Sequence, residues 1–146
     1  MKTWIAVAHR AGARILEHPG PGKPLALIEE LDHAEGRLKN IDIDTDRPGR
    51  AFDRQGGGRH ALEREESPHD RLASAFARAV AAKLRDGRTQ QRFGQLVLVA
   101  EPRFLGFLRG ALDPVSEGML AGTVNKDLAH VEVRDLAPHL SHLLPV

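Results

Sequence analysis

The residues best suited to chemistry lie in one stretch, RAFDRQGGGRHALE, which runs from Arg50 to Glu63. Three consecutive glycines let backbone N–H groups point into one concavity and let a second backbone come close. The neighbouring arginines can each donate two parallel hydrogen bonds to a phosphate. This pattern is typical of a loop that approaches an anion, but the same composition also suits a flexible linker, and the residues alone favour neither interpretation. The candidate binding residues are Arg50, Arg54, Gln55, Gly56, Gly57, Gly58, Arg59 and His60.

Two other motifs resemble nucleotide sites but lack essential parts. GPGKP contains Gly-Lys, yet Pro24 stands where a phosphate-binding loop needs Ser or Thr. The triplet NKD, Asn125 to Asp127, resembles the guanine-reading motif of GTPases but is one residue short, and no phosphate loop accompanies it. A polar strand exit, in which Lys126 and Asp127 pair or cap, is the simpler interpretation. Because ligands of open α/β sheets gather beyond the strand ends, these two residues and Arg103 of AEPR stay candidate contact residues.

Catalytic and metal-binding patterns are sparse. The chain has no cysteine, which excludes disulfides, thiolate catalysis and sulfur-based zinc sites. His139 and His142 are three apart on an expected helix, but that helix offers no carboxylate at matching spacing. A two-metal nuclease needs several carboxylates at strand ends, and no Gly-X-Ser-X-Gly motif occurs. We expect no metal, no cofactor and no enzymatic activity; a hydrolase that uses His60 or His69 is the least favoured alternative.

Length and charge limit the class of protein. The 146 residues suit a single domain over 1–146, with one hydrophobic core. Lys and Arg together number 21 and Asp and Glu 20, so any attraction to an anion must be local. No apolar run reaches the roughly 18–20 residues of a membrane helix, and the N-terminus lacks the pattern of a signal peptide. We expect a soluble, cytoplasmic protein without membrane insertion.

The elements that must position these residues begin with strands. The apolar run TWIAVA, Thr3 to Ala8, predicts a strand buried on both faces, and ARILEH predicts its antiparallel partner. The prolines and glycines of His18 to Pro24 predict a turn. The next stretch is ambiguous: its periodicity slightly favours a helix, while LALIEEL also suits a third strand. The apolar residues at helical spacing are Leu27, Ile28, Leu31, Ala34 and Leu38.

A long loop over about 39–66 separates the strands from a helix. Loops of this length in compact domains are usually functional or disordered. Ser67 as N-cap and Pro68 at the first helical position begin the helix, and Asp86-Gly87 predicts its end.

The rest of the chain alternates strands and helices. QLVLVA, Gln95 to Ala100, predicts a central buried strand, and Pro102 opens a helix that Asp113-Pro114 ends. GMLAGTV predicts another strand, and DLAPHLSHLL a last helix with Pro138 in its first turn and four leucines as its core stripe. The whole order predicts an α/β fold with a mixed sheet, in which an antiparallel meander precedes parallel crossovers. The four leucines are Leu136, Leu140, Leu143 and Leu144.

Four stretches resemble, in order and spacing, the host attachment protein family, which is named for a requirement in bacterial attachment to host cells. They are DRPGRAFDRQGGGRHALE, SPHD with FARAVAAKL, LVLVAEPRFLGFLRGAL, and VNKDLAH, and the resemblance covers nearly the whole chain. It implies the ribonuclease H-like α/β architecture of the middle domain of archaeal and eukaryotic class I release factors. It therefore implies a third meander strand at LALIEELD, followed by an αβαβα order.

The chain departs from the pattern of those relatives in two places. In the release factors, a catalytic Gly-Gly-Gln lies in the loop between the meander and a long helix, where Gln55 to Arg59 lie here. This chain has no glutamine after the glycines, so peptidyl-tRNA hydrolysis does not carry over. At the first hairpin, relatives usually have Ala-Asp-Gly or a similar turn, whereas this chain has Ala8-His9-Arg10.

The resemblance thus implies a non-catalytic, cytoplasmic, release-factor-like domain that binds RNA or the ribosome through its basic Gly-rich loop. Arg50, Arg54 and Arg59 would contact phosphates, while Arg103 and Lys126 would extend the surface. The alternative is an interaction factor that acts through protein partners in attachment to host cells or surfaces.

Overall fold

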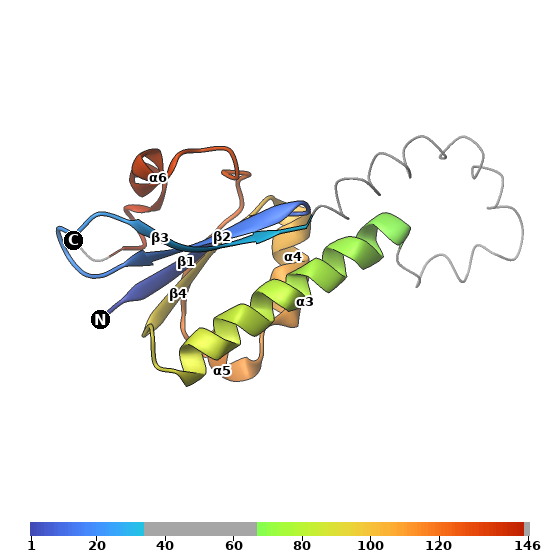
Figure 1. Ribbon diagram of the computed structural model, residues 1–146, viewed down its shortest axis with the longest axis horizontal. Coiled ribbons are helices and arrows are strands. Elements are labelled where there is room, and N and C mark those ends of the chain that lie inside the picture. The colour runs from blue at the N-terminus through green and yellow to red at the C-terminus, as the bar shows by residue number, and fades with distance from the viewer. Residues whose placement is uncertain (34–66, 145–146) are drawn as a thin grey trace, which may run out of the picture.

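A five-stranded mixed sheet forms the middle layer of the protein (Figure 1). The computed structural model describes residues 1–33 and 67–144, so the predicted loop at about 39–66 lies outside the described residues. The order of the strands in the sheet is β3-β2-β1-β4-β5. β1 pairs antiparallel with β2 and β2 with β3, whereas β1 pairs parallel with β4 and β4 with β5. The strands are β1 Thr3–His9, β2 Gly12–His18, β3 Ala26–Asp32, β4 Gln95–Val99 and β5 Leu120–Val124.

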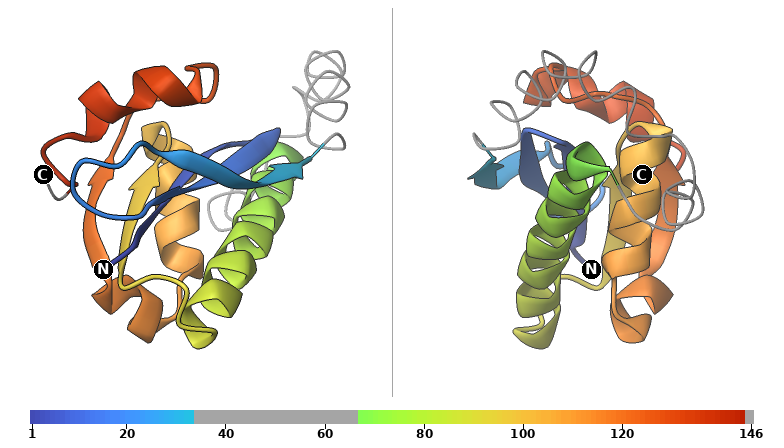
Figure 2. Two further views of the ribbon diagram at one scale, coloured as in Figure 1. Left: turned by 60° about the vertical axis from the view of Figure 1, so that its left-hand side comes forward. Right: turned by 90° about the vertical axis from the view of Figure 1, so that its right-hand side faces the viewer.

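Helices cover both faces of this sheet (Figure 2). The long helix α3, Pro68–Thr89, and helix α4, Pro102–Ala111, lie on one face, and α6, Val133–Leu140, lies on the other. A short helix, α5, Pro114–Gly118, links α4 to β5. The predicted α/β class, with a meander followed by parallel crossovers, is confirmed. That residues 1–146 form a single domain stays a prediction.

The apolar strands divide their side chains between two cores. In β1, Trp4, Ala6 and Ala8 belong to the core under α3 and α4. Ile5 and Val7 belong to the core under α6. Strand residues alternate between faces, so a strand with helices on both sides needs apolar residues at every position. The predicted strands TWIAVA and QLVLVA are confirmed, and the latter forms β4, an interior strand between β1 and β5.

The third strand corrects the helix that periodicity slightly favoured, and it confirms the strand implied by the resemblance. A register shift between Ile15 and Leu16 of β2 leaves Ile28 as an extra residue of β3, because Glu29 and Leu27 are the paired residues on either side. Such a bulge breaks the period-2 pattern of a strand. Ile28 and Leu31, three positions apart, therefore pack against the same core, which imitates the spacing of a helix.

Helix α3 begins as predicted and ends later than predicted. Ser67 is the N-cap, its side chain accepts from the backbone N–H of Asp70 at 3.0 Å, and Pro68 opens the helix. The helix continues through Asp86 and Gly87 to Thr89, so the predicted stop is wrong. Gly87 is buried against the ring of Trp4, where a Cβ atom would come within 2.4 Å of two ring carbons. This glycine allows a close approach inside the helix and does not form a cap.

The last two helices also differ from the sequence expectations. α4 ends as predicted before Asp113, but Asp113 then caps α5, which was not predicted: its carboxylate accepts from the backbone N–H of Ser116 at 3.2 Å. α6 begins at Val133, so Pro138 lies inside the helix and not in its first turn. The buried Leu136 and Leu140 hold α6 on the sheet in spite of this proline.

Replacement of Gly87 by alanine will test the contact with Trp4. The Trp4 ring cannot move easily, because Phe93 packs against it with ring centroids 4.8 Å apart. We expect Gly87→Ala to lower the free energy of unfolding by about 1–3 kcal/mol through overpacking. Denaturation in urea, monitored by tryptophan fluorescence, measures the change.

Gly106→Ala is the matched control, because a Cβ atom on this α4 residue meets nothing within 4 Å. Alanine favours a helix over glycine by about 1 kcal/mol, so this variant should be as stable as the wild type or more stable. Equal stability of the Gly87→Ala variant and the wild type would contradict the proposed role of Gly87.

Candidate functional site

One edge of the sheet collects most of the described candidate residues. The parallel strands β1, β4 and β5 all end at this edge, and α3 and α4 begin beside it. Arg103 follows β4, while Lys126 and Asp127 follow β5. We call this the carboxyl edge. Polar residues at the carboxyl ends of parallel strands form the usual ligand sites of open α/β sheets.

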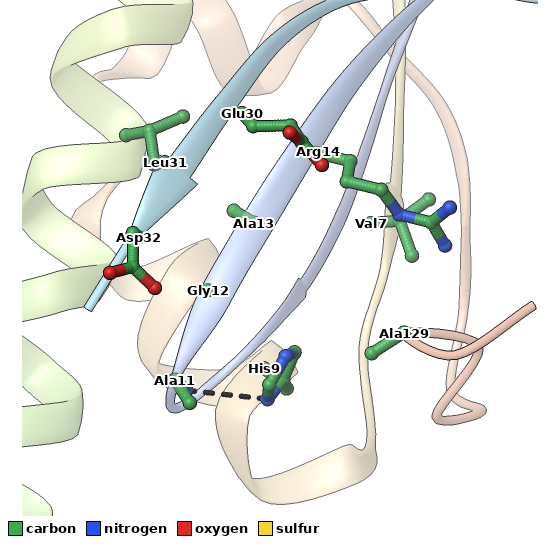
Figure 3. A pocket seen from close by; sticks show the side chains of 10 residues that line it. All are labelled: Val7, His9, Ala11, Gly12, Ala13, Arg14, Glu30, Leu31, Asp32 and Ala129. Carbon is green, nitrogen blue, oxygen red and sulfur yellow. Dashed lines mark hydrogen bonds between the residues drawn. The ribbon is translucent and has the colours of Figure 1, made fainter. Parts of the chain in front are cut away.

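On the α6 side of the carboxyl edge lies an open groove of about 570 Å³ (Figure 3). Its walls come from β1, β2 and β3 and from Ala129 in the loop after β5. Arg14 extends away from β3, and its Nη2 donates to the backbone oxygen of Leu128 at 3.0 Å. Three polar side chains share this groove with Arg14, namely His9, Glu30 and Asp32.

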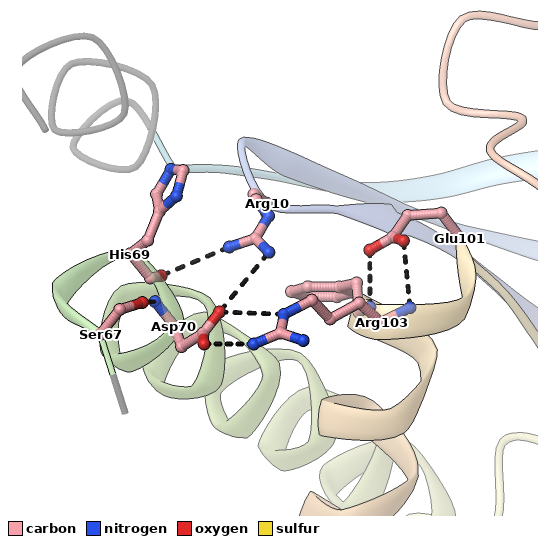
Figure 4. A network of polar contacts seen from close by, with 7 residues as sticks. Arg10, Ser67, His69, Asp70, Glu101 and Arg103 are labelled. Atoms are coloured by element: carbon pink, nitrogen blue, oxygen red, sulfur yellow. Dashed lines mark hydrogen bonds and ion pairs between the residues drawn. The ribbon is translucent and has the colours of Figure 1, made fainter. Parts of the chain in front are cut away.

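On the other side of the edge, Asp70 joins two arginines (Figure 4). Arg103 Nε donates to Asp70 Oδ1 at 3.1 Å, and Arg103 Nη2 donates to Oδ2. Arg10 Nη2 lies 3.7 Å from Oδ1 of the same carboxylate. We call Arg10, Asp70 and Arg103 the Asp70 cluster. Because Asp70 stands in the first turn of α3, the cluster ties α3 to the β1–β2 turn and to the start of α4.

Arg10 holds the chain on both sides of residues 34–66. Its Nη1 donates to the backbone oxygen of His69 at 3.4 Å, just after Ser67. The backbone oxygen of Arg10 contacts Nδ1 of His33 at 2.7 Å, and the backbone N–H of His33 donates to Ala11 at 3.0 Å. The chain therefore leaves and re-enters the described structure beside one hairpin turn.

The environment of Asp70 keeps its carboxyl group ionised. The hydrogen bond from Arg103 is the main cause that lowers the pKa of Asp70; burial opposes it, and the charges of Arg103 and Arg10 lower the pKa further. The Asp70 side chain is only 13% exposed. Such a carboxylate can hold the two arginine side chains in place, and it is not a proton donor near neutral pH.

The other acids of the edge stabilise backbone turns. Glu101 caps α4, since its carboxylate accepts from the backbone N–H groups of Arg103 at 3.0 Å and Phe104 at 2.6 Å. Asp127 accepts from the backbone N–H of Ala129 at 3.1 Å. Within residues 1–33 and 67–144, no three His, Asp or Glu side chains are grouped so that they could hold a metal ion.

The structure places only part of the predicted site. Arg103, Lys126 and Asp127 lie at the carboxyl edge, and all three are exposed. Arg103 was expected to extend the binding surface, and its guanidinium binds Asp70 here. The other predicted residues, Arg50, Arg54, Gln55, Gly56, Gly57, Gly58, Arg59 and His60, lie outside the described residues.

Sequence analysis missed Arg10 and the pairing of Asp70. An acidic residue in the first turn of a helix, as Asp70 is in α3, already stabilises the helix dipole and so gives no signal of a distant partner. The sequence did offer one sign of this contact. Arg10 is a cation at a hairpin turn where the family that the chain resembles usually has an acidic residue. His69, the candidate of the hydrolase alternative, has a buried Nε2 with no hydrogen-bond partner among the described residues.

Comparison with known proteins gives a family and a distant structural likeness. The family model described as "Protein required for attachment to host cells" matches residues 4–140. No curated protein matches the sequence. A solved structure titled "Archaeal protein" is 15% identical, with a TM-score of 0.47, over 97% of this chain and 38% of its own. The archaeal translation termination factor aRF1 is 13% identical, with a TM-score of 0.45, over 84% of this chain and 29% of its own.

This chain therefore spans well under half of the length of either solved structure. Among the described helices, none combines the length and the apolar character that crossing a membrane would require.

Replacement of Asp70 by asparagine will test the Asp70 cluster. A hydrogen bond to a charged group contributes about 1.5–3 kcal/mol, so we expect Asp70→Asn to lower the free energy of unfolding by roughly that amount at pH 7. Because folding lowers the pKa of Asp70, this advantage of the wild type is complete above the ordinary value of 3.8. The advantage is lost as the pH falls below that value through the pKa of the folded state. Urea denaturation of both proteins between pH 7 and pH 2.5 measures it.

The control is Asp86→Asn, which removes an exposed carboxylate from the last turn of the same helix. Its effect should stay within about 0.5 kcal/mol, as for most surface substitutions. A difference between wild type and Asp70→Asn that persists unchanged at pH 2.5 would contradict the ionic role of Asp70.

Proposed function

The chain belongs to the family of proteins required for attachment to host cells, and from this membership we propose that it is a non-catalytic, cytoplasmic, RNA-binding domain. The ribosome is the partner we expect, and the basic Gly-rich segment is the contact. One observation carries the proposal: the described chain on either side of residues 34–66 is held beside Arg10 at the carboxyl edge, through His33 and through the backbone oxygen of His69. The segment is thus attached where α/β domains place their ligands.

The charge of the part of this segment around the three glycines supports an anionic partner. Between Arg47 and His60 the sequence has four arginines and a single acid, Asp53. Three glycines stand among them, so a phosphate backbone can approach the main chain closely. Arginine suits phosphate because its planar guanidinium donates two parallel hydrogen bonds. The four arginines are Arg47, Arg50, Arg54 and Arg59.

Two described cations would extend such a surface. The Arg103 side chain is 60% exposed although it binds Asp70, so its position is fixed while it still faces solvent. Lys126 is exposed after β5, and the hydrogen bond of Asp127 to Ala129 fixes the turn that carries it. Cations that are already held in place lose less side-chain entropy when they bind.

Absence of catalysis is part of the proposal because of the order of residues in the segment. The glutamine precedes the glycines, as Gln55-Gly56-Gly57-Gly58-Arg59. In the class I release factors, the catalytic glutamine follows two glycines.

A second candidate function is contact with a protein partner in attachment. One observation favours it: the sheet ends in an exposed strand, β3, whose only charged residues are acidic. This strand includes none of the arginines named above, so the two functions can be tested with separate variants.

Sedimentation with ribosomes will test the RNA-binding proposal. We expect the wild type to co-sediment with 70S ribosomes at low salt and to dissociate as salt is added. The double variant Arg54→Ala/Arg59→Ala should bind at least about tenfold more weakly, since each charge-assisted hydrogen bond contributes about 1.5–3 kcal/mol. Its log–log salt slope should fall by roughly 2, because two phosphate contacts are removed.

Arg78→Ala/Arg85→Ala is the matched control, because both arginines are exposed on α3 and the charge change is the same. The control should bind ribosomes as the wild type does. Equal losses in the two double variants would assign the effect to net charge, and absence of wild-type binding at low salt would refute the proposal.

A further inference from the structure

The open edge of β3 is the clearest unassigned surface among the described residues. Among the described strands β3 lies at the edge of the sheet, so its backbone pairs with β2 on one side, while N–H and C=O groups point outward on the other. Ala26, Leu27, Glu30 and Asp32 are exposed along it. An exposed strand of this kind can accept an additional strand from another chain.

The groove of Figure 3 lies directly beside this edge. Strand pairing places His9, Gly12 and Asp32 in one row across the sheet, and Val7, Arg14 and Glu30 in the next. Gly12 has no side chain in the first row and its surroundings are tight, since a Cβ atom there would lie 3.2 Å from the backbone oxygen of Leu31 and 3.8 Å from His9 Nε2. The volume of the groove, about 570 Å³, is sufficient for a small ligand or long side chains.

The charges beside the open edge are mostly negative. Glu30 has no hydrogen-bond or ion-pair partner in the described part of the chain, and Asp32 lies two residues further along the same face. Arg14 does not neutralise them directly, because its guanidinium is turned toward β1 and held by Leu128. Glu29 binds Lys83 of α3 at 2.9 Å and so serves to hold β3 in place.

We propose that β3 and its groove bind an extended, basic segment of a partner protein. The segment adds to the sheet beside β3 and places Lys or Arg side chains next to Glu30 and Asp32. This inference does not depend on whether the Gly-rich segment binds RNA, because it uses other residues.

Charge decides between the three conceivable occupants of the edge. A second copy of this chain, paired through β3, would bring like carboxylates together, which destabilises a strand pair. An RNA backbone would meet the carboxylates of Glu30 and Asp32 and be repelled. A basic strand gains both the backbone hydrogen bonds and an ion pair with Glu30.

The spacing of the strands fits long cationic side chains. Side chains directly opposite Glu30 and Asp32 on an added strand have Cβ atoms about 5 Å from theirs. Gly12, which lines the groove, lies two strand spacings from the added strand, about 10 Å, and an extended Lys or Arg side chain can lean over β3 toward the groove. The partner should therefore alternate basic residues with small or β-branched ones.

Fluorescence anisotropy with a labelled peptide tests the proposal. The probe is a fluorescein-labelled peptide of four Thr-Lys repeats, and we expect it to bind the full chain. A Thr-Glu peptide of equal length should not bind. Glu30→Lys/Asp32→Lys should weaken the binding of the Thr-Lys peptide at least tenfold, while Asp86→Lys/Asp135→Lys, which reverses two exposed acids elsewhere, should retain it.

A second probe separates strand addition from simple attraction of charges. When proline replaces every threonine, the peptide keeps its charge but loses the N–H groups that a strand needs, so its affinity should fall at least tenfold. Equal binding of the Thr-Lys and Pro-Lys peptides would overturn strand addition. Unchanged binding by a folded Glu30→Lys/Asp32→Lys variant, or absence of binding by the wild type, would overturn the site.

Discussion

Burial of β1 on both faces is the constraint on which the rest of the structure depends. Every residue from Thr3 to Ala8 is buried, and the strand pairs antiparallel on one side and parallel on the other. It is therefore the single strand that joins the meander to the crossover half of the sheet. Its last residue, His9, and the turn that follows then lie at the carboxyl edge, between the groove and the Asp70 cluster. Neither surface would exist if β1 were an edge strand.

Local signals were sufficient for most of the fold. Strands that are apolar at every position, and helices opened by a capping residue and proline, were predicted close to their observed limits. The failures have particular causes: a bulge at Ile28 imitated helical spacing, and Gly87 resembled a helix stop although its role is contact with Trp4. Asp113-Pro114 carries the same start signal as Ser67-Pro68, so α5 could have been found.

The candidate site was less accessible to sequence analysis, because its contacts join distant parts of the chain. Arg10 and Asp70 are 60 positions apart, and Arg14 binds the backbone of Leu128 over 114 positions. Nothing in the spacing of these residues indicates such pairs. The strand ends did predict the place of Arg103, Lys126 and Asp127, because position at the carboxyl edge follows from strand order alone. Their partners depend on how the helices pack.

Two adjacent residues of the β1–β2 hairpin lie at two different surfaces of the protein. His9 faces the groove on the α6 side, whereas Arg10 reaches the Asp70 cluster on the α3 side. Side chains alternate along a strand, so a shift of one residue in the pairing of β1 with β2 would exchange the faces of one strand relative to the other. The register of this hairpin therefore determines both surfaces. Slippage by one residue would disturb the groove and the anchoring of α3 together.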